Sequence, residues 1–128
     1  MLITVPTKRT VEELAARLVE ACASEGFDVL GTIDLREKLS EQGQPFLRAC
    51  FIVEVCHPAL TRRAMEAAPE ISVALPCRIA VYEKDDGGRM LATIRPKDLL
   101  ALVGPGGRET AAVDVERSLR AIMEKAAS

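Results

Sequence analysis

Two short motifs contain the side chains that could carry chemistry, and each combines one cysteine with one proline. The first is Cys-His-Pro at residues 56–58, and the second is Leu-Pro-Cys at residues 75–77. A thiolate is a nucleophile and a metal ligand, so the pKa and exposure of each cysteine decide what it can do. Cys56 comes directly before the expected start of a helix, where the partial positive charge of the backbone amides stabilises a thiolate. The candidate ligand-binding or reactive-thiol residues are Cys56, His57, Pro58, Pro76 and Cys77.

Three interpretations of this cysteine pair remain open. If the two motifs lie side by side, Cys56 and Cys77 could bind a soft metal or cycle through a disulfide. With His57 they would supply three ligands, one short of a closed zinc site. Strand alternation opposes this, because Cys77 belongs to an apolar face whereas Cys56 alternates with Glu54, so the two thiols point apart unless the turn after Cys56 redirects one. In the third interpretation both are small packed residues. The spacing of the four cysteines matches no zinc template, and we predict no metal and no cofactor.

His57 is the only histidine, and it does not complete a catalytic set. A Cys–His pair must come within hydrogen-bond reach, which adjacent side chains such as Cys56 and His57 do not easily achieve. A solvent-facing or helix-capping role is favoured instead. Because no nucleophile, base and orienting residue can be assembled, we expect no hydrolase or transferase and name no catalytic residue. The glycine-rich residues 104–107 lack the Lys-Ser/Thr of a phosphate-binding loop, so we expect a linker there.

The elements that position these motifs follow from the spacing of apolar residues. Thr10 and Glu13 form a capping box that predicts the start of a helix, and Gly26 predicts its end. Pro58 is suited to the first position of a second helix, which Pro69 stops. The expected strands cover residues 1–5, 27–34, 46–56, 77–84 and 89–94. Helical segments are expected over 35–39, 97–103 and 109–126.

Side-chain alternation then predicts which faces are buried. In the strand over 46–56, the odd positions, Leu47 among them, should face the helices. Its even positions mix Arg48, Cys50, Ile52 and Glu54, which predicts a surface that a second subunit or a ligand covers. Phe27, Val29 and Ile33 are expected to share one face of their strand, and Met65, Met90, Ala92 and Ile94 are expected to face inward. The residues expected to face out from the second helix are Arg62, Arg63 and Glu66.

The element order β-α-β-β-α-β-β-α predicts an α+β fold. We expect a two-layer sandwich in which helices pack on one face of a mostly antiparallel sheet of about five strands. At 128 residues the chain has the length of a single domain, 1–128, and can bury an aliphatic core without a disulfide or a metal.

Composition excludes several classes of function. The net charge is −2 with interspersed charges, and aromatic residues make up 3%, so neither a basic stripe nor a stacking platform for nucleic acid is expected. No apolar run approaches the ~20 residues that span a bilayer, and residues 1–10 lack the pattern of a signal peptide. We therefore expect a cytoplasmic protein with reduced cysteines and with neither nucleic-acid nor membrane partners.

Several short motifs together resemble the domain-of-unknown-function family 302. They are Gly-Phe-Asp-Val-Leu at 26–30, Val-Cys-His-Pro at 55–58, Pro-Glu-Ile at 69–71, Leu-Pro-Cys at 75–77, the Gly-Gly turn at 87–88 and Arg-Pro at 95–96. The resemblance runs from about Thr7 to Val103, which leaves the last helix outside this core. It implies a fold like that of the TATA-binding protein, a dimeric state, and no settled activity. Two departures are His57, where the family usually has Asn, and Ser72, where it often has Gly.

We therefore expect a small binding or assembly domain that forms a homodimer. It would bury the mixed face of the strand over 46–56, or pair a sheet edge. A small ligand would occupy a cleft near the two motifs. The alternative is a thiol-dependent protein, namely a redox protein, a sulfur carrier or a soft-metal binder, that uses Cys56 with Cys77 in support.

Overall fold

The computed structural model describes residues 1–103 and 109–128, so the expected linker at 104–107 lies outside the described residues. The strands are β1 (Leu2–Thr7), β2 (Asp28–Asp34), β3 (Cys50–Cys56), β4 (Cys77–Glu83) and β5 (Arg89–Ile94). The helices are α1 (Val11–Ser24), α2 (Leu35–Glu41), α3 (Pro58–Ala67), α4 (Pro96–Ala101) and α5 (Glu109–Ala127), with a 3-10 helix η1 (Pro69–Val73). The α+β fold predicted from the sequence is confirmed.

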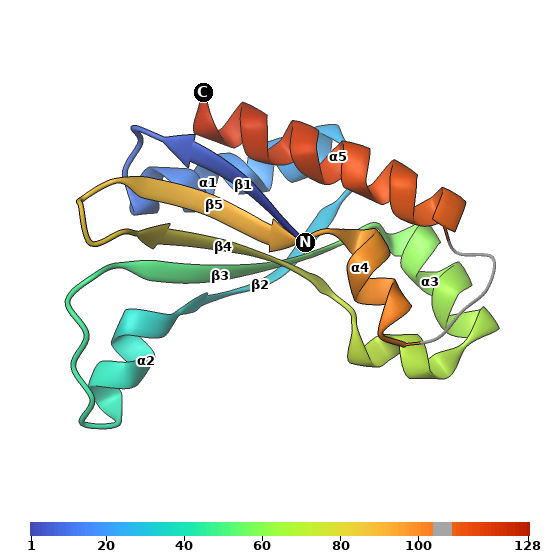
Figure 1. The fold of residues 1–128 in the computed structure, drawn as a ribbon, viewed down its shortest axis with the longest axis horizontal. Helices are drawn as coiled ribbons and strands as arrows, with labels where there is room; N and C mark the ends of the chain where they lie inside the picture. Colours follow the sequence, from blue (N-terminus) through green and yellow to red (C-terminus); the bar gives the residue numbers. More distant parts are fainter. Residues whose placement is uncertain (104–108) are drawn as a thin grey trace.

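The five strands form one antiparallel sheet in the order β1-β5-β4-β3-β2. Figure 1 shows α1 and α5 together on one side of this sheet, whereas α3 and α4 lie beyond one end of it. The core lies between the sheet and this pair of helices. Its fully buried side chains include Leu14, Leu18, Val53, Ile79, Leu91 and Leu119.

Local sequence signals explain how α1 begins and ends. The Thr10 hydroxyl accepts a hydrogen bond from the Glu13 amide at 3.2 Å, as the capping box predicts. Gly26 follows the helix with a φ of +75°, a conformation that glycine adopts at little cost. The next residue, Phe27, is buried in the core. These two ends fix the direction in which the chain reaches β2.

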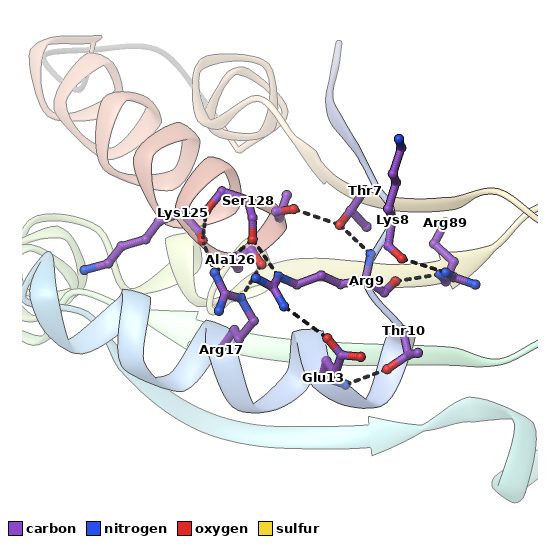
Figure 2. A network of polar contacts seen from close by, with 11 residues as sticks. Thr7, Lys8, Arg9, Thr10, Glu13, Arg17, Arg89, Lys125, Ala126 and Ser128 are labelled. Carbon is purple, nitrogen blue, oxygen red and sulfur yellow. Dashed lines mark hydrogen bonds and ion pairs between the residues drawn. The ribbon is translucent and has the colours of Figure 1, made fainter.

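Polar contacts join α1 to the end of α5, and Figure 2 shows this network. Arg17 donates hydrogen bonds to the carbonyl oxygens of Ala126, Lys125 and Ser128 at 2.8, 3.0 and 3.1 Å. The Thr7 hydroxyl donates to the carbonyl of Ala127 at 2.9 Å. Carbonyls in the last turn of a helix have no partner within it, so these donors satisfy groups that would otherwise need water.

Several expected strand faces are wrong. β3 begins at Cys50, because residues 46–49 form a loop in which Leu47 is 92% exposed. A bulge between Val29 and Gly31 shifts the register of β2, so Ile33 pairs with Ile52 and leaves the face that Val29 occupies. The sequence prediction continued the alternation of side chains across both irregularities, so it assigned Leu47 and Ile33 to the wrong face.

The β5 prediction is also wrong, since Leu91 and not Met90 faces the helices. Leu91 is fully buried, and it pairs with Val81 of β4, whose side chain also lies in the core. Met90 and Ile94 therefore point to the opposite face, where Ile94 is 40% exposed. Alternation fixes the spacing of faces along a strand, but it does not decide which face meets the helices.

The side of the sheet opposite α1 and α5, which we name the open face, combines apolar and charged side chains. The register aligns Ile52, Ala80 and Ala92 across three strands, and pairs Glu54 with Arg78. Arg48 does not take part, because it lies in the loop before β3 and forms an ion pair with Asp85 at 2.9 Å. Among the described residues, no helix is both long and apolar enough to cross a membrane.

Candidate functional site

The two cysteine motifs meet at one end of the sheet. β3 ends at Cys56, β4 begins at Cys77, and Val55 pairs with Cys77 in the antiparallel register. The chain turns directly from Cys56 into α3. Alternation along the strands predicts opposite faces for the two thiols, but both side chains line the same cavity. The turn after Cys56 therefore brings the two thiols to the same cavity, which alternation along the strands could not predict.

This cavity has a volume of about 290 Å³ and lies beyond the end of the sheet. Most of its wall is apolar and comes from α3, α4, α5 and the segment around η1. Among its lining residues are Leu60, Ala64, Ile71, Leu75, Leu99 and Val115. None of the residues of α3 is fully buried, although the helix carries an apolar stripe. The stripe of α3 thus faces a hollow and not a packed core.

Cys77 is the more enclosed of the two thiols, since only 8% of the residue is exposed. Burial, together with the nearby Cys56, raises the pKa of the Cys77 thiol to about 11. Cys77 is therefore protonated at neutral pH and is a weak nucleophile and metal ligand. Cys56 is only partly buried and is the more accessible sulfur.

His57 is held in place by contacts on two sides. Its Nδ1 accepts a hydrogen bond from the Leu60 amide at 3.3 Å, so His57 caps α3, as predicted. Its ring meets the edge of the Phe27 ring, with centroids 5.5 Å apart and planes at 84°. A Cβ at Gly26 would lie 3.6 Å from its Nε2. The imidazole therefore has a defined structural role beside the cavity.

The two prolines of the motifs lie outside the wall of this cavity. Pro58 is the first residue of α3, as expected from its fixed φ. Pro76 follows a cis peptide bond after Leu75, and it borders a second hollow together with Glu54 and Arg78. The structure thus brings Cys56, His57 and Cys77 together and separates the prolines from them.

Comparison with known families identifies the chain. Residues 3–126 match the family described as Domain of unknown function DUF302. The protein belongs to the DUF302 family. The match is longer than the stretch from which the resemblance was inferred, and it includes most of α5.

A solved structure supports the same placement. The DUF302 protein is similar to a crystal structure of an uncharacterized conserved DUF302 protein from Bacillus stearothermophilus, with a TM-score of 0.90 and 29% sequence identity. The alignment covers 98% of this chain and 97% of the other. A comparison with curated proteins found no match. The family and the fold are therefore established, whereas the activity is not.

The structure agrees with part of the orientation expected for α3 of this DUF302 protein. Arg63 is exposed, as expected, and it also lines the cavity, whereas Met65, which was expected to face inward, is 43% exposed. The short helix α3 gave too few apolar positions to fix its rotation. Phe27, which was expected to share a strand face with Val29, both joins the core and lines the cavity. Within residues 1–103 and 109–128, no group of three or more His, Cys, Asp or Glu side chains is placed to hold a metal ion.

Proposed function

We propose that this DUF302 protein binds a small, largely apolar ligand in the cavity beside Cys56, His57 and Cys77. The observation that carries the proposal is an apolar hollow of about 290 Å³ between secondary-structure elements. Ligand pockets are typically concave and mostly apolar, with a few polar groups that orient the ligand. Leu60 and Ala64 of α3 are only partly buried by the protein itself. A ligand would bury this stripe without any change in the fold.

A cavity-filling substitution tests this proposal. Ala64→Phe places a large side chain into the cavity, whereas Ala59→Phe makes the same change on the exposed side of α3. Octan-1-ol serves as the neutral probe, and methyl chemical shifts of Leu60, Leu99 and Val115 report on it. We expect saturable shifts in the original protein and in Ala59→Phe, and an affinity at least roughly tenfold weaker in Ala64→Phe. The absence of shifts at these methyls up to millimolar octanol, and up to the same concentration of the anionic and cationic analogues of octanol, would overturn the proposal.

We further propose that the protein assembles as a homodimer through the open face of its sheet. Two features support this surface. Ile52, Ala80 and Met90 make it apolar at its centre, and Glu54 lies beside Arg78 at one end. Within the described residues, neither Glu54 nor Arg78 belongs to an ion pair of its own chain. In a two-fold dimer each residue meets the reciprocal residue of the partner, so Glu54 of one copy can face Arg78 of the other.

The mass in solution tests the dimer. Light scattering after gel filtration at micromolar concentration should give twice the 13.9 kDa of one chain. A mass near 13.9 kDa would contradict the dimer and leave the ligand proposal unaffected. The two proposals therefore fail separately.

Thiol chemistry at Cys56 is the second candidate function, and the observation that favours it is the shared cavity of the two sulfurs. In this alternative the Cys56 thiolate attacks one sulfur of a low-molecular-weight disulfide. A mixed disulfide forms, and the released thiolate takes up a proton. Because Cys77 stays protonated at neutral pH, it supports such chemistry poorly, and we place this function second.

The rates at which the thiols react with a disulfide reagent over a range of pH test whether Cys56 carries out this chemistry. Cys56→Ser and Cys77→Ser assign the observed rates to individual sulfurs. If the thiol chemistry is correct, Cys56 reacts faster with a disulfide reagent near pH 7 than a model thiol does. A rate equal to that of the model thiol would remove its physical basis.

A further inference from the structure

The polar groups in the cavity wall can donate hydrogen bonds, and one of them, Arg63, carries a positive charge. Besides the two thiols, they belong to His57, Thr61 and Arg63. No Asp or Glu side chain lines the cavity among the residues that the structure describes. The described part of the wall therefore offers a cation and neutral donors to a ligand, and no carboxylate that would repel an anion.

The hydrogen bond to Nδ1 determines what His57 contributes. Since Nδ1 accepts a hydrogen bond from the Leu60 amide, the neutral ring carries its proton on Nε2. His57 is consequently a donor at its free nitrogen. This nitrogen lies beside Gly26, so the charged contact with a ligand is assigned to Arg63 and not to His57.

Arg63 differs from its neighbour Arg62 in its surroundings. The Arg62 Nε donates to the Glu66 carboxylate at 2.9 Å on the outer side of α3. Arg63 is an exposed residue that also lines the cavity, and within the described part of the chain it takes part in no ion pair. Its guanidinium can therefore take a carboxylate in the two-bond arrangement that arginine favours.

The volume limits the size of the ligand. The cavity measures about 290 Å³, near the lower end of the range of about 300–1,000 Å³ that is typical of small-molecule pockets, so it suits a small ligand. We infer that the cavity takes a medium-chain monocarboxylic acid, with its hydrocarbon tail against Leu60, Leu75 and Leu99 and its carboxylate at Arg63. This inference rests on the proposed ligand-binding function and names the chemical class of the ligand. Octanoic acid has this size and chemistry and serves as the probe.

Three probes with the same chain and different head groups test the inference. Octanoate, octan-1-ol and octylammonium are titrated into the full chain at pH 7.5 and low salt. We expect octanoate to bind most tightly and its affinity to fall as salt rises, because the contact with Arg63 is electrostatic. Arg63→Gln should weaken octanoate on the order of tenfold, as the loss of one charged hydrogen-bonded contact does, and leave octanol unchanged. Arg62→Gln is the matched control and should change neither, and Arg63→Lys should recover part of the octanoate affinity.

The outcomes separate this inference from the function on which it rests. Equal affinities for octanoate and octanol, together with no effect of Arg63→Gln, would overturn the carboxylic-acid inference and leave the cavity proposal intact. Tightest binding of octylammonium would overturn it as well. Binding of none of the three probes would overturn the ligand proposal itself. Circular dichroism of each variant confirms that the fold is retained.

Discussion

At the scale of single residues, the structure assigns His57 a structural role before any chemical one. Its Nδ1 is engaged by the Leu60 amide, and its ring packs on Phe27. A general base needs a free lone pair directed at the proton that it removes, so this nitrogen does not serve Cys56. Cys56 is the more accessible of the two thiols in the cavity. In the proposed thiol chemistry Cys56 is therefore the reacting residue, and His57 holds the start of α3 in place.

Two substitutions of His57 separate its capping of α3 from the packing of its ring on Phe27. His57→Ala removes the acceptor for the Leu60 amide and should lower the free energy of unfolding by about 1 kcal/mol. His57→Asn keeps a side-chain acceptor at the same position and should retain most of the capping contribution. Urea unfolding of the three proteins measures the differences. An equal loss in both variants would show that the cap is not what His57 contributes.

The raised pKa of Cys77 makes stability depend on pH in a defined direction. The folded thiol titrates at about 11, whereas in the unfolded chain it titrates near its ordinary value of 9.0. Between pH 9 and 11 the unfolded chain has lost a proton that the folded chain keeps, so the free energy of unfolding falls as pH rises. At about 1.4 kcal/mol for each pKa unit, Cys77 accounts for roughly 2–3 kcal/mol of this decrease.

Urea unfolding at pH 8, 9, 10 and 11 checks the effect. Cys77→Ala should show a shallower decline than the original protein. Ile79→Val, a conservative change at a buried position in the same strand, should lower stability at every pH without changing the slope. A slope that is identical in Cys77→Ala and the original protein would contradict the effect.

At the scale of elements, the sequence predicts regular segments well where caps and turns mark their ends. α1 has Thr10 at its start and Gly26 after its end, and both signals are local in the sequence. β3 lacks such a mark, so alternation extended it backward through Leu47 into a loop. The bulge in β2 is likewise invisible to a period of two. Both errors arise because tertiary contacts decide where pairing starts.

The same distinction applies to the candidate site. Cys56 and Cys77 could be singled out from their motifs, because residue type and a nearby proline are features of the sequence. Their shared cavity could not, since it depends on the turn that redirects the chain after β3. Arg63 was not assigned to the site because it lies about 100° around α3 from its neighbour Ala64, and it is both exposed and a lining residue. Reactive residue types can thus be identified from the sequence, whereas the side chains that meet at one site cannot.

The junction of α1 and α5 leads to a prediction about helix ends. Arg17 donates to three carbonyl oxygens in the last residues of the chain. Arg17→Met should lower the free energy of unfolding by about 1–3 kcal/mol, because carbonyls at the helix end lose a charged donor. Arg120→Met is the matched control, since Arg120 forms only a surface pair with Glu116 at 3.2 Å. Arg120→Met should lower the free energy of unfolding by about 0.5 kcal/mol or less. Urea unfolding measures the effect of both substitutions. Equal effects of the two substitutions would contradict a capping role for Arg17.

At the scale of the whole molecule, the two proposed functional surfaces lie next to each other along the same strands. Glu54 precedes Cys56 in β3, and Arg78 follows Cys77 in β4. Glu54 and Arg78 are on the open face, whereas the two cysteines line the cavity. Assembly at the open face would therefore hold the strand ends that form part of the cavity wall. The neighbouring ends of β3 and β4, two inner strands of the sheet, would thereby connect the proposed dimer with the geometry of the proposed ligand site.

Charge reversal at this pair gives the sharpest test of the dimer. In a two-fold arrangement Glu54→Arg places two cations at each contact and Arg78→Glu places two anions there, so each single variant should shift the mass toward 13.9 kDa. The double variant Glu54→Arg/Arg78→Glu restores opposite charges across the axis and should recover the dimer. Light scattering at several protein concentrations measures the mass. Arg48→Glu is the control, because Arg48 pairs with Asp85 in the loop before β3 and should leave the dimer intact. If both single variants kept the dimeric mass, the interface would have to lie elsewhere on the molecule, since a buried face cannot hold two like charges in contact without a penalty of several kcal/mol.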